Sequence, residues 1–218
     1  MKTDPIESIP ALDGIPRIAA GFVGRIPGLD VSVERAEAMS RLAMPHRDIL
    51  RRAGLGSYPM ATAEQIHGNE VHILSDRSEL HAKGADGFVT TIRGVTLGIY
   101  VADCAPVWVV ARDGSAGALL HSGKKGTQLG IVPEGIRILC SMMSLVPQDL
   151  IAVIGPCIRP PCYEVDFAAQ IRSQAHAEGV MEIHDEMTCT ACEPGRYYSY
   201  RREHGFTGRM LATLTLLP

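Results

Sequence analysis

The sequence predicts an α+β fold: a single domain in which mixed β-sheets pack against flanking helices. The chain has 218 residues, near the usual upper size of one domain. Its 46% hydrophobic and 21% charged residues are typical of a globular protein with a sizeable core. The apolar patterns of strands and helices follow one another without the regular alternation of a doubly wound sheet. We therefore expect residues 1–218 to form one domain without internal repeats or linkers.

The beginning of the chain predicts an irregular lead-in followed by one helix. Residues 1–16 are expected to be irregular. Residues 28–50 predict a helix, because apolar side chains recur there at helical spacing, namely at Val33, Ala36, Met39 and Leu42. We expect Pro45 to end this helix, since proline lacks the amide hydrogen that the next turn would use.

The middle and end of the chain predict more strands, interrupted by two helices. Residues 58–74 read as two strands around a turn at His67-Gly68-Asn69. Residues 84–123 supply several strands, broken by turn signals at Arg93-Gly94 and Asp113-Gly114. The remaining predicted elements are a helix in 130–146, a buried strand in 149–158, a helix in 167–180 closed by Gly179, and a strand in 205–217.

Charge and hydropathy exclude some partners. The formal net charge is −3 and no basic stripe occurs, which argues against a nucleic-acid partner. No apolar run approaches the roughly 18 residues that cross a bilayer, so we expect no membrane association. The N-terminus has acids and prolines where a signal peptide has an apolar segment. We therefore expect a cytoplasmic protein whose six cysteines are thiols or metal ligands.

Three residues at predicted strand ends suggest a metal site. His67 in QIHGNE, Cys104 in VADCAP and His121 in LLHSGKKG each follow an apolar run and precede glycine or proline. Two imidazoles and one thiolate suit zinc, and three protein ligands leave a position open for water. Asp103 would orient a ligand or transfer a proton. The alternative is a cysteine acting as a small buried side chain and two surface histidines, since the spacing matches no compact metal motif.

The chain resembles the multicopper polyphenol oxidase (laccase-like) family, whose members are also described as purine nucleoside phosphorylases with adenosine deaminase activity. The resemblance rests on QIHGNEV, GADGFVTT, GIYVADCAPVWV, HSGKKGTQLGIV, IGPCIRPPCYEVD and CTACEPGRYYSYRREHGFTGRM, in this order between about Gln65 and Met210. It implies one zinc ion bound by His67, Cys104 and His121. It also implies phosphorolysis of adenosine or inosine, with deamination of adenosine as a companion activity.

The sequence departs from the family pattern at two places. The usual HAGWRG is HSGKKG here, so Lys124 and Lys125 replace a tryptophan and an arginine. A flat stacking surface and a planar guanidinium are lost. Near the N-terminus Arg25 is kept, but the asparagine-bearing segment that should follow is missing. We expect zinc binding to survive these changes, and purine specificity and turnover to be altered.

Further polar residues are candidates for the site. Arg25, Lys125 and Arg201 would bind phosphate, because guanidinium and ammonium groups match phosphate oxygens; solvated surface is the alternative. Cys157 lies in the Gly-Pro-Cys loop that ends the strand predicted in 149–158, and it is expected to line the active site. With Cys162, Cys189 and Cys192 it forms C-x4-C and C-x2-C pairs. We interpret these cysteines as loop thiols in preference to a structural zinc site, since the C-x4-C spacing is loose.

Four functional hypotheses remain. The first is a zinc enzyme acting on a purine nucleoside and phosphate. The second is a metal-free cysteine hydrolase, with Cys104 as nucleophile and His121 as base. The third is copper-dependent phenol oxidation, for which one cysteine and two histidines form a thin ligand set. The fourth is a non-catalytic nucleoside-binding protein, favoured by Lys124 and Lys125.

Overall fold

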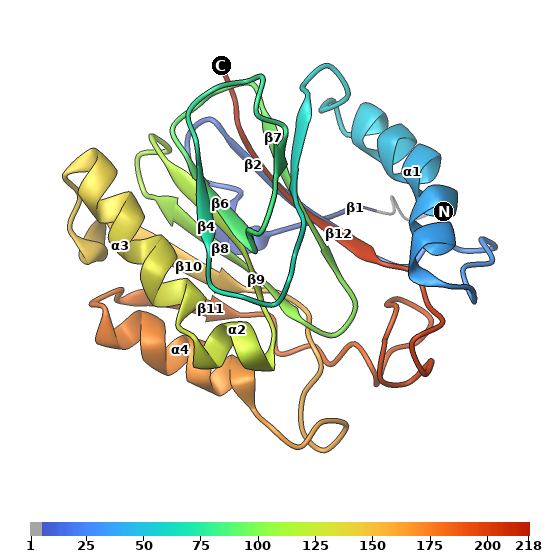
Figure 1. Ribbon diagram of the computed structural model, residues 1–218. Helices are drawn as coiled ribbons and strands as arrows, with labels where there is room; N and C mark the ends of the chain where they lie inside the picture. Colours follow the sequence, from blue (N-terminus) through green and yellow to red (C-terminus); the bar gives the residue numbers. More distant parts are fainter. Residues whose placement is uncertain (1–5) are drawn as a thin grey trace.

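Two six-stranded β-sheets pack face to face in the computed structural model, which describes residues 6–218 (Figure 1). The first sheet has the order β1 (Ile6–Ser8), β2 (Ile18–Val23), β12 (Met210–Leu216), β7 (Thr96–Val101), β3 (Met60–Ala63) and β5 (His81–Ala82). The second has the order β11 (Glu182–Asp185), β10 (Leu150–Ile154), β8 (Ala105–Ala111), β9 (Gly117–Ser122), β6 (Gly87–Thr90) and β4 (Val71–Leu74). Both sheets mix parallel and antiparallel pairs, as the predicted fold class requires.

The core lies between the sheets because alternate side chains of each strand point inward. In β8, Trp108 and Val110 belong to the intersheet core, while Val107 and Val109 belong to the core on the opposite face. The first sheet contributes residues such as Phe22 to the intersheet core. A hydrogen bond from Trp108 Nε1 to the Thr213 carbonyl, 2.9 Å long, joins the two sheets. Strand β8 is therefore buried on both faces, which explains its unbroken apolar sequence.

Helices cover the outer faces of both sheets. Helix α1 (Arg35–Arg52) packs Ile49 and Leu50 against β2 and β12 of the first sheet. Helices α3 (Ile131–Met143) and α4 (Phe167–Ala177) cover the second sheet, and the short α2 (Lys124–Gln128) precedes them. Figure 1 shows α1 on one side of the molecule and α3 and α4 on the other. The layers thus run helix, sheet, sheet, helix.

Two expectations about the N-terminal part of the chain are wrong. Helix α1 does not end at Pro45 but continues to Arg52. Proline removes one backbone hydrogen bond, but the helix beyond it buries His46, Ile49 and Leu50, and this packing outweighs the loss. The expected irregular lead-in contains β1 and a single 3₁₀ turn at Pro10–Leu12, while residues 1–5 lie outside the described part.

The other predicted elements are confirmed, with one topological addition. The two strands around His67-Gly68-Asn69 are β3 and β4, but they belong to different sheets. The chain likewise passes from the first sheet to the second between β7 and β8. Helix α4 is followed by Gly179 at a positive φ of 97°, as expected for a helix end.

Among residues 6–218, no helix combines the length and the apolar character that a bilayer-spanning segment needs.

Candidate metal centre and cavity

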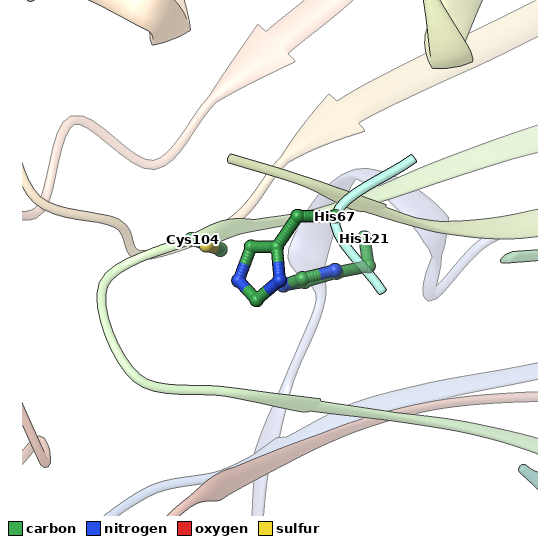
Figure 2. A group of neighbouring side chains, drawn as sticks. All are labelled: His67, Cys104 and His121. Carbon is green, nitrogen blue, oxygen red and sulfur yellow. The ribbon is translucent and has the colours of Figure 1, made fainter. Parts of the chain in front are cut away.

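The three predicted ligands lie together where the chain crosses between the sheets. His67 lies in the β3–β4 crossing, Cys104 in the β7–β8 crossing, and His121 in β9 of the second sheet. One ligand atom from each lies within 4.8 Å of the others. Figure 2 shows the two imidazoles beside the thiol. The fold therefore brings together side chains that are far apart in sequence.

The loop that carries His67 is fixed by two polar side chains. Gln65 Nε2 donates to the Tyr100 carbonyl at 2.6 Å, and the Tyr100 amide donates to Gln65 Oε1 at 2.9 Å. The Asp86 carboxylate accepts hydrogen bonds from the amides of Ile66, His67 and Gly68, at 3.2, 2.8 and 2.7 Å. This anchoring holds Gln65 and His67 in the left-handed region, with φ of 62° and 63°. Such backbone costs roughly 1–3 kcal/mol per residue and is concentrated at functional sites.

Asp86 also orients His121. Its Oδ1 lies 2.8 Å from His121 Nδ1, and both side chains are almost fully buried. Burial raises the pKa of Asp86, but the hydrogen bonds from His121 and the Gly68 amide outweigh it, so this pKa is lower than usual. An ionised Asp86 holds a proton of His121 on Nδ1, so Nε2 is the nitrogen that can bind a metal once its own proton is released.

The surroundings of Cys104 favour the thiolate form of its side chain. Burial raises its pKa, but the charges and hydrogen bonds of His121 and His67 outweigh burial and bring it to about 6. In the same way, burial lowers the pKa of His121, while Cys104 and Asp86 raise it to about 9. A thiolate and two imidazoles, one of them oriented by a carboxylate, match the ligands of zinc. The residues present therefore fit the metal that the sequence predicted.

Close packing against Gly123 positions the thiol. A Cβ atom at residue 123 would lie 2.5 Å from Cys104 Sγ, well inside van der Waals contact. A larger residue here would therefore have to displace the thiol. The restriction comes from space and not from the backbone, since the φ of −93° is open to any residue.

The three predicted ligands line a cavity of about 1130 Å³. Its wall carries an aromatic set and a cationic set. The aromatic set is Tyr100, Tyr163, Phe167, Tyr200 and Phe206. The cationic set is Arg35, Lys124, Lys125, Arg201 and Arg209. Cavities of this size that combine apolar surface with a few polar groups are typical ligand sites.

The cationic residues differ in how far they are neutralised. Arg201 donates to Glu164 at 2.7 Å and stacks on Tyr163, and Lys124 lies 3.7 Å from the same Glu164. Within residues 6–218, no carboxylate pairs with Arg35, Lys125 or Arg209. Burial and the nearby Arg35 lower the pKa of Arg209. Unpaired positive charges that face one cavity favour an anionic ligand.

Asp103 lines the cavity but is committed to structural contacts. Its Oδ1 accepts from Thr190 Oγ1 and its Oδ2 from the Arg201 amide, both at 2.7 Å. Its backbone is held at a φ of 85°. With each carboxylate oxygen occupied, Asp103 joins the β7–β8 crossing to the segment that carries Arg201.

Two predicted site residues lie elsewhere. Arg25 does not line the cavity, because it is paired with Glu203 at 2.7 Å and stacks on Tyr198. Cys157 was expected to line the site, but it is completely buried and forms an isolated β-bridge with Cys189. Burial raises the pKa of Cys157 to about 12, so it is a neutral core thiol.

Two residues of the site, Asp86 and Arg35, were not expected from the sequence. Asp86 occurs in the quoted GADGFVTT stretch, and an acid directly before a buried strand was a usable signal. Arg35 occupies the first turn of α1, where nothing in the local pattern distinguishes it from a surface residue. Arg209 follows Arg201 and Arg202 closely in the sequence and was a phosphate candidate with them; it directly precedes β12.

The fold and the site define a class: an α+β protein of two facing sheets, with a candidate His₂Cys metal centre at an open cavity. The chain belongs to the family described as multi-copper polyphenol oxidoreductase laccase, whose model matches residues 23–169 and 165–217.

Similar proteins agree with this assignment. The purine nucleoside phosphorylase YlmD of Geobacillus stearothermophilus is 31% identical over 189 residues, which cover 68% of this chain and 69% of that protein. The purine nucleoside phosphorylase YlmD of Bacillus subtilis is 29% identical over 189 residues, covering 69% of this chain and 68% of its own. The crystal structure of the Geobacillus YlmD has a TM-score of 0.80 at 25% identity, covering 94% of this chain and 93% of its own. A Bacillus licheniformis hypothetical protein, YfiH, shares the fold with a TM-score of 0.85 at 22% identity, covering 99% and 97%.

Proposed function

We propose that the protein is a zinc-dependent purine nucleoside phosphorylase that also deaminates adenosine. The observation that carries this proposal is the meeting of His67, Cys104 and His121 on a cavity with aromatic and unpaired cationic walls. The names of the two YlmD relatives support the substrate class.

Each part of the cavity has a role in this proposal. Zinc held by His67, Cys104 and His121 would supply Lewis-acid chemistry and make a nucleophile available near neutral pH. Tyr163, Tyr200 and Phe206 offer ring faces on which a purine base can stack. Arg35, Lys125 and Arg209 hold the phosphate, since they are the cations without carboxylate partners. Arg201, predicted to bind phosphate, shares its charge with Glu164 and contributes more weakly.

In phosphorolysis, a phosphate oxygen bonds to the ribose C1′ while the bond from C1′ to the purine nitrogen breaks. The base takes the electron pair of that bond and needs a proton. The sequence suggested Asp103 as the donor of this proton. Because both of its carboxylate oxygens accept hydrogen bonds, from Thr190 and from the Arg201 amide, we instead propose that Asp103 positions the segment that carries Arg201. His204, a cavity-lining imidazole outside the ligand set, is our candidate donor.

The activity is tested with a panel of purine nucleosides, incubated with pure protein in the presence and absence of phosphate. We expect adenosine and inosine to give free base and ribose 1-phosphate only with phosphate, and adenosine to give inosine without it. Chromatography identifies the products. Intact nucleosides under both conditions, with the metal retained, would contradict the proposal.

The metal ligands are tested by comparing Cys104→Ser with Cys140→Ser. Cys140 lies on α3 and contacts the core of the second sheet, so its replacement should leave the bound zinc unchanged. Cys104→Ser should weaken zinc retention at the centre, since it removes the thiolate. Equal zinc dissociation constants at that centre would exclude the assignment.

A second candidate is the metal-free cysteine hydrolase. The thiolate character of Cys104 and the raised pKa of His121 are the observations that favour it, because they are also the properties of a catalytic pair. The two candidates respond oppositely to metal removal. A zinc enzyme loses activity on treatment with a chelator and regains it with zinc, whereas a cysteine hydrolase keeps its activity and is inactivated by thiol alkylation.

A further inference from the structure

Three cysteines outside the cavity form a second cluster. The Sγ atoms of Cys162, Cys189 and Cys192 lie within 4.8 Å of one another, and those of Cys162 and Cys192 are 3.5 Å apart. Cys162 belongs to the loop before α4, and the other two belong to the segment between β11 and β12. Cys157, the fourth cysteine of the sequence pattern, is not part of this group.

The spacing of the three thiols matches metal coordination. A tetrahedral site with zinc–sulfur bonds of about 2.3 Å separates its sulfur atoms by about 3.8 Å. A disulfide instead needs sulfur atoms about 2.05 Å apart. The 3.5 Å separation and the upper limit of 4.8 Å lie on either side of the first value, so a metal ion fits with small side-chain movements. Thiolates are soft ligands, which selects zinc over magnesium or calcium.

We propose that Cys162, Cys189 and Cys192 bind a second zinc ion, separate from the centre at His67. This proposal is independent of the catalytic function. From the sequence, these cysteines were interpreted as loop thiols, because the C-x4-C spacing is loose. The fold brings the two segments that carry them together, and a metal site now accounts for them better. Three thiolates leave one zinc position for a further ligand, and Cys192 is exposed, so the ion can enter from solvent.

The cluster lies behind one wall of the cavity. Tyr163, which lines the cavity, directly follows Cys162. Thr190, which directly follows Cys189, donates to Asp103 at 2.7 Å. Arg202 Nη1 donates to the Ala191 carbonyl at 3.0 Å. A zinc ion at the cluster therefore joins the loop that carries Tyr163 to the segment that holds Asp103, and fixes the wall where the purine is proposed to stack.

The test is the number of zinc ions per chain in reduced, metal-stripped full-length protein that has been reloaded with zinc and freed of excess metal. We expect two ions in the wild type and one in Cys192→Ser. Cys104→Ser should lose the ion at the cavity but keep the one at the cluster, and Cys104→Ser/Cys192→Ser should bind none. Cys140→Ser is the matched control and should keep two. Because Cys192 is exposed and serine is nearly the same size, the variant should fold, which circular dichroism checks.

Cobalt provides a readout that does not depend on comparing variants with the wild type. Cobalt-loaded Cys104→Ser should show the strong thiolate-to-metal charge-transfer absorption of a multi-thiolate site, although its cavity centre has lost its only thiolate. Absence of this absorption would overturn the proposal. So would a reduced Cys104→Ser protein that binds no zinc but forms a Cys162–Cys192 disulfide on oxidation. If the cluster binds zinc but the cavity centre does not, the wild type and Cys104→Ser should each bind one ion, and Cys192→Ser should bind none.

Discussion

Asp86 Oδ1 lies 2.8 Å from His121 Nδ1, and the same carboxylate accepts the amide hydrogen of His67. The Asp86 carbonyl also accepts the His121 amide at 2.8 Å. One buried acid therefore positions both histidines of the proposed metal centre: it holds the ring of His121 and the backbone of His67.

Replacing Asp86 by asparagine should weaken zinc binding by 10- to 100-fold, the usual effect of losing a carboxylate behind a histidine ligand. The amide cannot supply the negative charge that holds the His121 proton on Nδ1. Competition with a chromophoric chelator measures the affinity. Asp113→Asn is the control, because Asp113 accepts a turn hydrogen bond from the Ser115 amide and does not line the cavity. Equal affinities for the two variants would show that Asp86 does not orient the ligand.

Gly123→Ala should displace the Cys104 thiol and reduce zinc occupancy, because the new Cβ would lie 2.5 Å from Sγ. The matched control is Gly14→Ala, where an added Cβ meets no atom within 4 Å. Metal content by atomic emission and melting temperature are measured together. We expect the Gly123 variant to lose zinc with little loss of fold stability in the stripped protein. Full zinc occupancy in this variant would refute the packing explanation.

The double substitution Lys124→Trp and Lys125→Arg should raise nucleoside turnover. Both lysines line the cavity, so a new ring there can stack on a purine, which is worth about 1–3 kcal/mol in nucleic-acid sites. A guanidinium also matches phosphate better than an ammonium does. A gain of about 1.4 kcal/mol in transition-state binding is tenfold in kcat/KM. A change of less than twofold, with fold and metal intact, would mean that this chain recognises its substrate differently from the family pattern.

His46 should make the protein less stable in mild acid. It is 1% exposed, and neither ring nitrogen has a hydrogen-bond partner within residues 6–218. Burial lowers its pKa to about 4 from the usual 6.5. Above about pH 6.5 the imidazole is neutral in both states. As the pH falls from 6.5 to about 4, His46 binds a proton in the unfolded chain but not in the folded one. The free energy of unfolding therefore decreases over this range, and the contribution of His46 levels off below about pH 4.

The full effect of His46 is about 3 kcal/mol. The check is denaturant unfolding of the wild type and of His46→Leu at several pH values. Between pH 7 and 4 the free energy of unfolding of the wild type should fall by this amount more than that of His46→Leu. His81→Gln, which alters an exposed histidine, should follow the wild-type profile. Parallel pH profiles for the wild type and His46→Leu would show that His46 is protonated in the folded protein.

The sequence predicts those strands whose ends are marked locally. Gly94 and Gly114 adopt positive φ at the turns that separate β6 from β7 and β8 from β9, so their positions could be read directly. Strand β2 was not predicted, because its sequence IAAGFV is rich in small residues. It forms because β1 and β12 pair with it on either side. Pro45 similarly remains helical because of tertiary packing that local pattern does not contain.

The site residues likewise fall into two groups: those with a local signal in the sequence and those whose role depends on contacts made only in the folded chain. His67, Cys104 and His121 carry a local signal, an apolar run ending in a polar residue, and the structure brings them together. Arg25 carries the right chemistry, but its guanidinium is taken by Glu203, 178 positions away in the sequence. The role of Asp86 depends on three amides that reach it only after folding.

The crossings between the sheets have a consequence for mutations far from the cavity. His67 and Cys104 lie on such crossings, while His121 lies within the second sheet. Their separation is therefore governed by how the sheets stack, and this stacking depends on core side chains such as Trp108, whose indole reaches the carbonyl of Thr213 in the opposite sheet. We expect a change of volume there to shift one sheet against the other while the hydrogen bonds inside each sheet survive. The chain would then keep its secondary structure and its overall shape, yet the proposed metal ligands would be misaligned, so zinc binding and activity would be lost before any visible loss of fold.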